Sequence, residues 1–281
     1  QYPGVADSIE SDIDNIATLL RISGLIPSGI DLQPLLDDAK HQLKDETNYR
    51  KEARHQQTFA AALAGDARYL VPEIHADLGK KNVLAMSYVE GQAIETLGHL
   101  AQVTRNQIMA ALFELMLREL FELRSMQTDP NFANYLYNAD TQQIVLLDFG
   151  ATRNFKAGFS AQYKKLVKAA LDGDETGICN AAAKLGYAVG EQNTAYRALV
   201  TELFRTVLEP LKQQQSFDFA NTDLPARLGK LGEHARAFRD FWQAPPADAV
   251  YLHRKVGGMF LLATRLQAQV NLRQLVSEWL D

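Results

Sequence analysis

The stretch Gln127-Thr128-Asp129-Pro130-Asn131-Phe132-Ala133-Asn134 is followed, after a polar turn, by Ile144-Val145-Leu146-Leu147-Asp148-Phe149-Gly150. Two short apolar runs, residues 134–137 and 144–147, flank the polar residues 138–142, and this pattern predicts a β-hairpin. A hairpin brings the start of its first strand and the end of its second strand together. We therefore expect Asn134 and Asp148 at the same end of the ribbon, with Asp129 on the loop just before it.

These three side chains suit phosphoryl transfer. Asn134 and Asp148 can hold Mg²⁺ on the phosphates, and Asp129 can orient or deprotonate an attacking hydroxyl group or water. The spacing from Asp129 to Asn134, followed by Asp148-Phe149-Gly150, matches the catalytic core of the protein-kinase fold. The alternative interpretation is an acidic turn in an ordinary core.

The composition excludes several classes of protein. The formal net charge of the 281 residues is −5, which argues against a general nucleic-acid binder. A single cysteine, Cys179, excludes a disulfide framework, and we expect it to be a buried free thiol rather than a nucleophile. No signal peptide leads the chain, and no apolar run reaches membrane-spanning length. The sequence starts at Gln1-Tyr2-Pro3-Gly4 without an initiator Met, so we expect a fragment.

Helical periodicity dominates the rest of the chain. It predicts helices over residues 7–22, 33–64, 104–126, 156–170, 175–184, 195–212 and 250–279. Strand-forming residues predict strands at 69–74 and 82–89, and polar or Pro-rich loops are expected at 213–224 and 243–247. Thr104 and Gln107 form a capping-box pattern at the start of the third helix.

Two glutamates lie on or beside the apolar face of the helix expected over residues 33–64. Glu46 falls within the apolar stripe and Glu52 lies beside it. A carboxylate near a core face requires a cation or a metal opposite it. Either both side chains lie at the solvated margin of the stripe, or one is the C-helix glutamate that pairs with the phosphate-binding lysine of a kinase-like small lobe.

Longer motifs carry a resemblance to a known family. They are Gln1-Tyr2-Pro3-Gly4-Val5-Ala6, Asp45-Glu46-Thr47-Asn48-Tyr49-Arg50-Lys51-Glu52-Ala53, Tyr88-Val89-Glu90-Gly91, Gln127-Thr128-Asp129-Pro130-Asn131, Leu147-Asp148-Phe149-Gly150-Ala151-Thr152-Arg153 and His253-Arg254-Lys255. With these motifs the chain resembles the UbiB/AarF-type atypical kinase family of ubiquinone biosynthesis, and most of all its mitochondrial branch. The motifs span nearly the whole chain.

The resemblance implies an α+β, protein-kinase-like two-lobe fold, mostly helical, with an incomplete N-terminal lobe. Residues 1–89 would form the partial N-lobe with the C-helix region and hinge strand, and residues 90–281 the helical C-lobe with the catalytic hairpin. The implied cofactors are ATP and Mg²⁺. The implied site residues are Asp129, Glu52 and Glu46 for catalysis, Asn134 and Asp148 for the metal, and Met86, Tyr88, Val89 and Leu136 for the nucleotide.

The chain also departs from the family. Asn48 stands in the third place of the family's Glu-x-Asp motif. The phosphate-binding lysine, the Ala-rich nucleotide loop and the Lys-x-Gly-Gln helix are expected upstream of Gln1, so we expect this chain to turn over ATP poorly. Asn131 replaces the usual kinase lysine, and no Ala-Pro-Glu follows Gly150, which argues against a peptide-docking activation segment.

The function implied is that of a Mg²⁺-dependent, ATP-binding atypical kinase or ATPase supporting ubiquinone (coenzyme Q) biosynthesis. The alternative is a pseudokinase scaffold that binds nucleotide or lipid without catalysis. Implied partners are ubiquinone-biosynthesis proteins or isoprenoid lipid precursors, with peripheral membrane contact at the cytoplasmic face of a bacterial inner membrane or in the mitochondrial matrix. The apolar face of the C-terminal helix, which includes Met259, Phe260, Leu262, Leu266, Val270 and Leu280, is expected to pack in the core rather than on a membrane.

Overall fold

The computed structural model describes residues 13–15, 17–18, 33–187, 194–238 and 245–280. The chain divides into two compact units, residues 1–99 with 127–153 and residues 100–126 with 154–281. The expected division between residues 89 and 90 does not coincide with these units, because the hairpin groups with the N-terminal segment. As a boundary between kinase lobes, that division stays a prediction.

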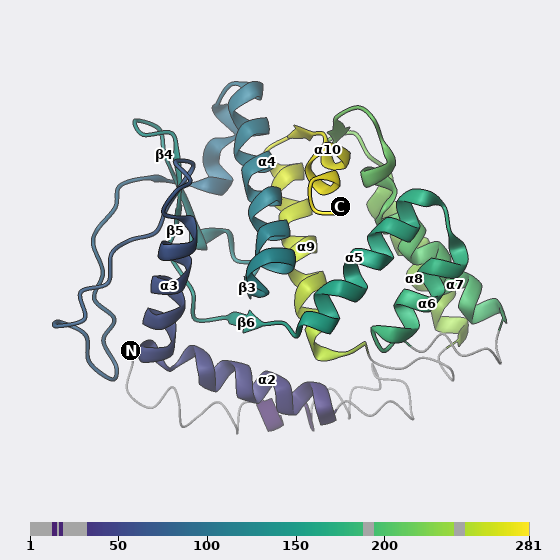
Figure 1. The fold of residues 1–281 in the computed structure, drawn as a ribbon, viewed down its shortest axis with the longest axis horizontal. Helices are drawn as coiled ribbons and strands as arrows, with labels where there is room; N and C mark the ends of the chain where they lie inside the picture. Colours follow the sequence, from purple (N-terminus) through teal and green to yellow (C-terminus); the bar gives the residue numbers. More distant parts are fainter. Residues whose placement is uncertain (1–12, 16, 19–32, 188–193, 239–244, 281) are drawn as a thin grey trace. The chain divides into compact units, whose positions relative to one another are not determined.

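The predicted hairpin forms the centre of the first unit (Figure 1). Strands β4 (Tyr135–Asn138) and β5 (Gln143–Leu146) pair with Tyr135 opposite Leu146. The Asn138 carboxamide oxygen accepts hydrogen bonds from the backbone N–H groups of Asp140 and Thr141, so this side chain shapes the turn. The prediction of a hairpin from the sequence is therefore confirmed.

Two short strands complete this sheet, whose order is β1-β5-β4-β2. Strand β1 (Tyr69–Leu70) runs parallel to β5, and β2 (Gln92–Ala93) runs antiparallel to β4. The strand expected over residues 82–89 is reduced to isolated bridges, one of which joins Met86 to Ile74. The short helix η1 (Ile94–His99) follows β2.

The helix expected over residues 33–64 is two helices, α2 (Gln33–Glu46) and α3 (Tyr49–Leu63). The break lies at Asn48, whose side-chain oxygen accepts a hydrogen bond from the Lys51 N–H at 3.1 Å and caps α3. The prediction of one continuous helix was wrong because apolar periodicity runs on across the cap. Of the helix expected over 7–22, only residues 13–15 and 17–18 are described, and they are helical.

The second unit is mainly helical. Its elements are α4 (Gln102–Arg118), η2 (Glu119–Leu123), α5 (Ala157–Asp172), α6 (Glu175–Lys184), α7 (Thr194–Val207), η4 (Glu209–Lys212), β7 (Phe217–Asp218), α8 (Leu224–Ala235), η5 (Arg236–Phe238), α9 (Ala247–Arg265), β8 (Gln269–Val270) and α10 (Leu272–Ser277). The short strands β3 (Ser125–Gln127) and β6 (Thr152–Asn154) form a separate two-stranded sheet.

Three sequence predictions in this unit need correction. Helix α4 begins at Gln102 behind Ala101, which makes no side-chain cap bond in the described structure, so the capping box at Thr104 was wrong. Helix α8 occupies residues where no helix was expected. The helix expected over 250–279 is interrupted at Gln267, which adopts a left-handed φ of 49°.

The apolar face of α9 packs in the core of the second unit, as predicted. Met259 and Leu262 of α9, and Leu266 just after it, have no exposed surface, and Val270 of β8 is 3% exposed. Cys179 is a buried free thiol whose sulfur lies 2.9 Å from the Thr201 hydroxyl oxygen. Among the described residues, no helix is both long and apolar enough to cross a membrane.

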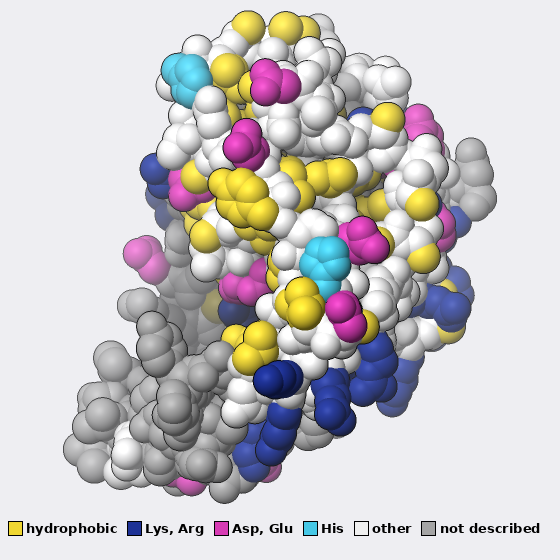
Figure 2. Space-filling model, turned by 90° about the vertical axis from the view of Figure 1, so that its left-hand side faces the viewer, with side chains coloured by type: hydrophobic (Ala, Val, Ile, Leu, Met, Phe, Trp, Pro, Cys, Tyr) yellow, Lys and Arg dark blue, Asp and Glu magenta, His cyan; other side chains and the backbone are white. Residues whose placement is uncertain are grey.

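Charge is unevenly spread on the face drawn in Figure 2. Lys and Arg side chains gather in the lower part of that face, and acidic, apolar and His side chains are mixed above them. The net charge of −5 therefore does not describe the surface locally.

Candidate functional site

The end of the hairpin brings the predicted catalytic loop and the predicted metal ligands together. The amide nitrogen of Asn134 donates a hydrogen bond to Asp129 Oδ2 at 2.9 Å. The backbone N–H of Asn131 donates to Asp129 Oδ1 at 3.3 Å, and the Asn131 side chain caps the short helix η3 (Phe132–Asn134). These contacts hold the Asp129 carboxylate beside Asn134.

Asp148 lies two residues after the end of β5, near Asn134. The Leu147 N–H donates to the Asn134 carbonyl at 3.0 Å, so the two positions are neighbours across the ribbon. The Gly150 N–H donates to Asp148 Oδ1 at 2.8 Å. Although Asp148 is open to solvent on one side, partial burial raises the pKa of its carboxyl group; the nearby Asp129 charge raises it further, and the Gly150 hydrogen bond opposes both.

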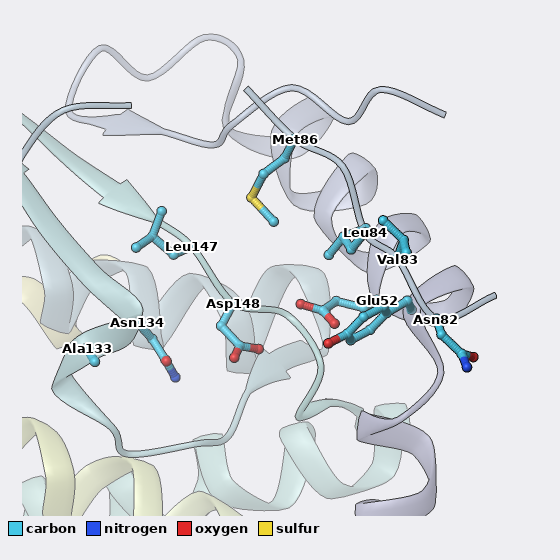
Figure 3. Close-up of a pocket in the computed structure, with 10 residues that line it drawn as sticks. Glu52, Asn82, Val83, Leu84, Met86, Ala133, Asn134, Leu147 and Asp148 are labelled. Carbon is cyan, nitrogen blue, oxygen red and sulfur yellow. The ribbon is translucent and has the colours of Figure 1, made fainter. Parts of the chain in front are cut away.

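Glu52 approaches Asp148 from helix α3. It lies in the first turn of α3 and is 8% exposed. A Cβ atom on Gly150 would lie 3.6 Å from Glu52 Oε2 and 3.3 Å from Asp148 Oδ1, so the two carboxylates meet over this glycine. Figure 3 shows the Glu52 side chain directed toward Asp148. Glu52 is therefore inside the site and not at a solvated helix margin.

Helix α3 is anchored to the segment after Asp148. The ring centroids of Phe59 and Phe149 lie 4.9 Å apart, and both residues are 1% exposed. The His55 ring nitrogen Nδ1 lies 3.4 Å from the Phe149 carbonyl oxygen. This packing keeps Glu52 and Asp148 together, because each lies within a few residues of an anchored ring.

A pocket of about 460 Å³ opens between these elements of the first unit (Figure 3). Its lining residues are Tyr49, Glu52, Asn82, Val83, Leu84, Met86, Ala133, Asn134, Leu147 and Asp148. Met86 is held in this wall by Gln56, whose amide nitrogen donates to the Pro72 carbonyl at 2.8 Å and lies 3.8 Å from the Met86 sulfur. The volume is within the usual range for small-molecule sites.

Not every predicted residue reaches this pocket. Met86 lines it, but Tyr88 is 87% exposed and Val89 and Leu136 are absent from the lining. Leu147 is an apolar lining residue of the pocket, whereas Leu136 is paired with Ala93 in the sheet and does not line it. As nucleotide contacts, Tyr88, Val89 and Leu136 stay predictions.

Two further residues of this region, Glu46 and Tyr49, bear on the prediction of the site from the sequence. Glu46 is the last residue of α2, and its side chain lies outside the described part of the structure. Tyr49 lines the pocket but was not predicted. Its position three residues before Glu52 on one helix face was the available signal, because residues so spaced are surface neighbours.

The donor set fits a hard divalent cation. Asn134 and Asp148 present a carboxamide and a carboxylate to one pocket, and oxygen ligands of this kind suit Mg²⁺, which keeps several waters or phosphate oxygens as its other ligands. Among the described residues there is no group of three or more His, Cys, Asp or Glu side chains that could hold a metal without such help. The pocket thus suits a metal that arrives with a phosphate-bearing ligand.

The family of this chain is identified by its similarity to known proteins. A sequence model of the ABC1 atypical kinase-like domain matches residues 1–182. The chain belongs to the ABC1 atypical kinase-like family. This is the UbiB/AarF family, as the sequence motifs predicted.

Several relatives of the chain are named as mitochondrial atypical kinases. The chain is 38% identical to rat atypical kinase COQ8B over 99% of its length and 36% identical to Saccharomyces cerevisiae atypical kinase COQ8 over 99%. It covers 52% and 56% of those two proteins, so it spans about half of their length. It is also 31% identical to a probable serine/threonine-protein kinase, abkA, of Dictyostelium discoideum, covering 51% of that protein.

A solved structure supports the ABC1 kinase-like fold. The chain aligns with Rv3197 of Mycobacterium tuberculosis, determined as a complex with erythromycin, with a TM-score of 0.74 and 21% identity. The alignment covers 99% of this chain and 69% of Rv3197. The expected α+β, kinase-like fold is therefore confirmed.

Proposed function

We propose that this chain forms the catalytic part of a Mg²⁺-dependent, ATP-binding atypical kinase or ATPase that supports ubiquinone biosynthesis. The observation that carries the proposal is the convergence of Asn134, Asp148 and Glu52 on one pocket, with Asp129 hydrogen-bonded to Asn134. Membership of the ABC1 family supports the same chemistry.

In this proposal each side chain has one task. Asp148 and Asn134 hold Mg²⁺, which supplies charge neutralisation for the phosphates when it is bound. Asp129 orients the attacking hydroxyl group or water. Glu52, the C-helix glutamate, pairs with the phosphate-binding lysine of the small lobe, and Glu46 is an accessory acid. Met86 contacts the base at the back wall, with Tyr88, Val89 and Leu136 as further predicted nucleotide contacts.

The proposed setting is the surface of a membrane. Ubiquinone precursors are lipids, so the partners we propose are ubiquinone-biosynthesis proteins or isoprenoid lipid precursors, met by peripheral contact. The mitochondrial relatives support a mitochondrial location, for which we propose the matrix. The cytoplasmic face of a bacterial inner membrane would be the equivalent place.

Equilibrium binding of ATP at fixed and varied Mg²⁺ concentrations tests the proposal. We expect Asp148→Asn to weaken Mg²⁺-dependent ATP binding by tenfold or more, since one metal ligand loses its charge. Asp140→Asn is the matched control, because Asp140 lies on the exposed turn at the other end of the same hairpin; it should leave binding within twofold. Equal effects of the two substitutions would remove the metal site from the proposal.

A second comparison separates an enzyme from a nucleotide-binding scaffold. Asp129→Asn should retain ATP binding but abolish phosphate release or transfer in a protein that has activity, because Asp129 acts on the attacking group. Unchanged turnover would favour another residue as the orienting group.

A further inference from the structure

Thr128 is the residue immediately before Asp129, and it makes two hydrogen bonds to a single acceptor. Its hydroxyl group donates to the Ala151 carbonyl oxygen at 2.8 Å, and its backbone N–H donates to the same oxygen at 3.2 Å. Thr128 has no exposed surface, and Ala151 is 5% exposed. The contact is therefore shielded from competition with water.

The two partners stand beside the two acidic groups of the site. Thr128 precedes Asp129, and Ala151 lies three residues after Asp148. On the other side of the site, Asn134 bonds to the Asp129 carboxylate, and its carbonyl accepts from Leu147 N–H. The segments that carry Asp129 and Asp148 are thus joined at two places, through Asn134 at the hairpin and through the contact between Thr128 and Ala151.

We infer that Thr128 is a positioning residue that sets the separation of Asp129 from Asp148 by holding the Ala151 carbonyl. This inference rests on the proposed function, because the separation matters only when a metal-bound phosphate lies between the two groups. Sites of this kind lose function when their supporting contacts allow shifts of about 0.5–1 Å.

The hydroxyl group is the stronger half of the contact. At 2.8 Å it has the usual length of an O–H···O bond, whereas the N–H bond at 3.2 Å is at the long limit. Without the hydroxyl group, one long bond remains, and the two segments can move apart. A hydrogen bond of ordinary net strength corresponds to about a 3- to 10-fold change in a binding constant.

The chain offers a matched control in Thr152. This residue is also a buried threonine next to the Asp148 segment, 9% exposed, but its Oγ1 atom has no hydrogen-bond partner within the described ranges. Thr152→Val removes a buried hydroxyl group without removing a hydrogen bond. Thr128→Val removes the hydroxyl group that donates to the Ala151 carbonyl, and Thr128→Ser keeps a hydroxyl group at position 128.

The experiment measures the Mg²⁺ concentration that half-saturates ATP binding, together with the affinity for ATP in excess chelator and the thermal midpoint of each variant. We expect Thr128→Val to raise the half-saturating Mg²⁺ concentration about 3- to 10-fold, with metal-free ATP affinity unchanged. Thr128→Ser should restore it to within twofold, and Thr152→Val should match the parent chain. A structural role alone would lower the thermal midpoint without this selective change in metal dependence.

Other outcomes overturn the inference. If Thr128→Val and Thr152→Val have the same Mg²⁺ dependence, or if Thr128→Ser fails to restore it, Thr128 does not position the acidic pair. If the parent chain itself shows no Mg²⁺-dependent ATP binding, the proposed function is wrong, and the inference about Thr128 is then wrong as well. The parent measurement distinguishes these two failures.

Discussion

The Asp148 carboxylate lowers the stability of the folded chain when it is ionised. Because the folded chain raises the pKa of this carboxyl group above its ordinary value of 3.8, the folded state binds its proton more tightly than the unfolded state. The free energy of unfolding therefore falls as the pH rises from about 3.8 through the raised pKa. At neutral pH the ionised Asp148 carboxylate therefore destabilises the folded chain, and a bound divalent cation would offset this effect.

We predict that Asp148→Asn stabilises the metal-free chain at pH 7. The carboxamide oxygen can still accept the Gly150 N–H, and the unfavourable charge near Asp129 is removed. Urea unfolding in chelator should show a gain at pH 7 that shrinks at pH 5, while Asp140→Asn shows neither effect. A loss of stability at pH 7 would mean that the Asp148 charge has a favourable partner.

His253 belongs to a different polar cluster, in which it contacts two tyrosine hydroxyl groups. Its Nε2 atom lies 3.0 Å from the Tyr163 hydroxyl oxygen and 2.9 Å from that of Tyr187, and the two hydroxyl oxygens are 2.8 Å apart. Although part of the residue is exposed, burial of the ring lowers the pKa of His253 to about 4. Burial likewise raises the pKa of Tyr187 to about 12, so all three groups are neutral at pH 7.

We predict that this cluster makes the chain sensitive to mild acid. Between the ordinary His pKa of 6.5 and the lowered value of about 4, the unfolded state binds the proton and the folded state does not, so stability falls as the pH falls through this window. In urea unfolding at pH 7 and pH 5.5, His253→Gln should lose less stability between the two pH values than the parent chain. An identical slope in both proteins would show that His253 is not the group responsible.

At the scale of elements, the close approach of β2 and β4 depends on a glycine. A Cβ atom on Gly91, just before β2, would lie 2.8 Å from the Leu136 Cβ atom, a contact that real side chains do not make. We predict that Gly91→Ala lowers the free energy of unfolding by about 1–3 kcal/mol, since the strand must shift to relieve the contact.

The matched control for that change is Gly98→Ala in η1. A Cβ atom there would meet no atom of the described structure within 4 Å. Denaturant unfolding of both variants checks the prediction: Gly98→Ala should be neutral or slightly stabilising, by about 0.5 kcal/mol. Equal losses from both substitutions would point to a backbone effect and not to the contact with Leu136.

Elements that depend on local signals were predictable from the sequence, whereas breaks without such signals were not. The hairpin has two strand-forming runs and a polar turn, and α6 has sharp boundaries, with Asp174 as its N-cap. The break before α3 was missed because Asn48 caps a helix whose third residue, Lys51, does not complete a capping box. The bend at Gln267 was missed because a glutamine, not a glycine, adopts the left-handed conformation.

Some residues of the candidate site could be predicted from the sequence, and others could not. Asp129, Asn134 and Asp148 flank one hairpin, so sequence spacing was enough to bring them together. Tyr88, Val89 and Leu136 were expected as nucleotide contacts from the family resemblance, and none of them lines the pocket. Residues 82–89, expected as a regular strand, form only isolated bridges. Pairing across the sheet, which turns Leu136 toward Gly91, cannot be read from spacing alone.

For the molecule as a whole, the buried face of α9 leads to a prediction about membranes. Met259 and Leu262 have no exposed surface, so this face is not available to lipid in the folded chain. We expect the 281-residue chain not to float with anionic vesicles in a density gradient. Flotation that disappears on charge reversal at Arg265 and Arg273 would show that the C-terminal segment leaves the core to bind lipid.

The order of strands in the first unit also has a consequence for the newborn chain on the ribosome. Among the described strands, β1 pairs with β5 and β2 with β4, so β2 has no partner until residue 138 has been made and β1 has none until residue 146. At typical synthesis rates, β2 waits roughly 3–10 s for the hairpin. Both waiting strands are two residues long, which leaves little edge for another nascent chain to pair with during that delay.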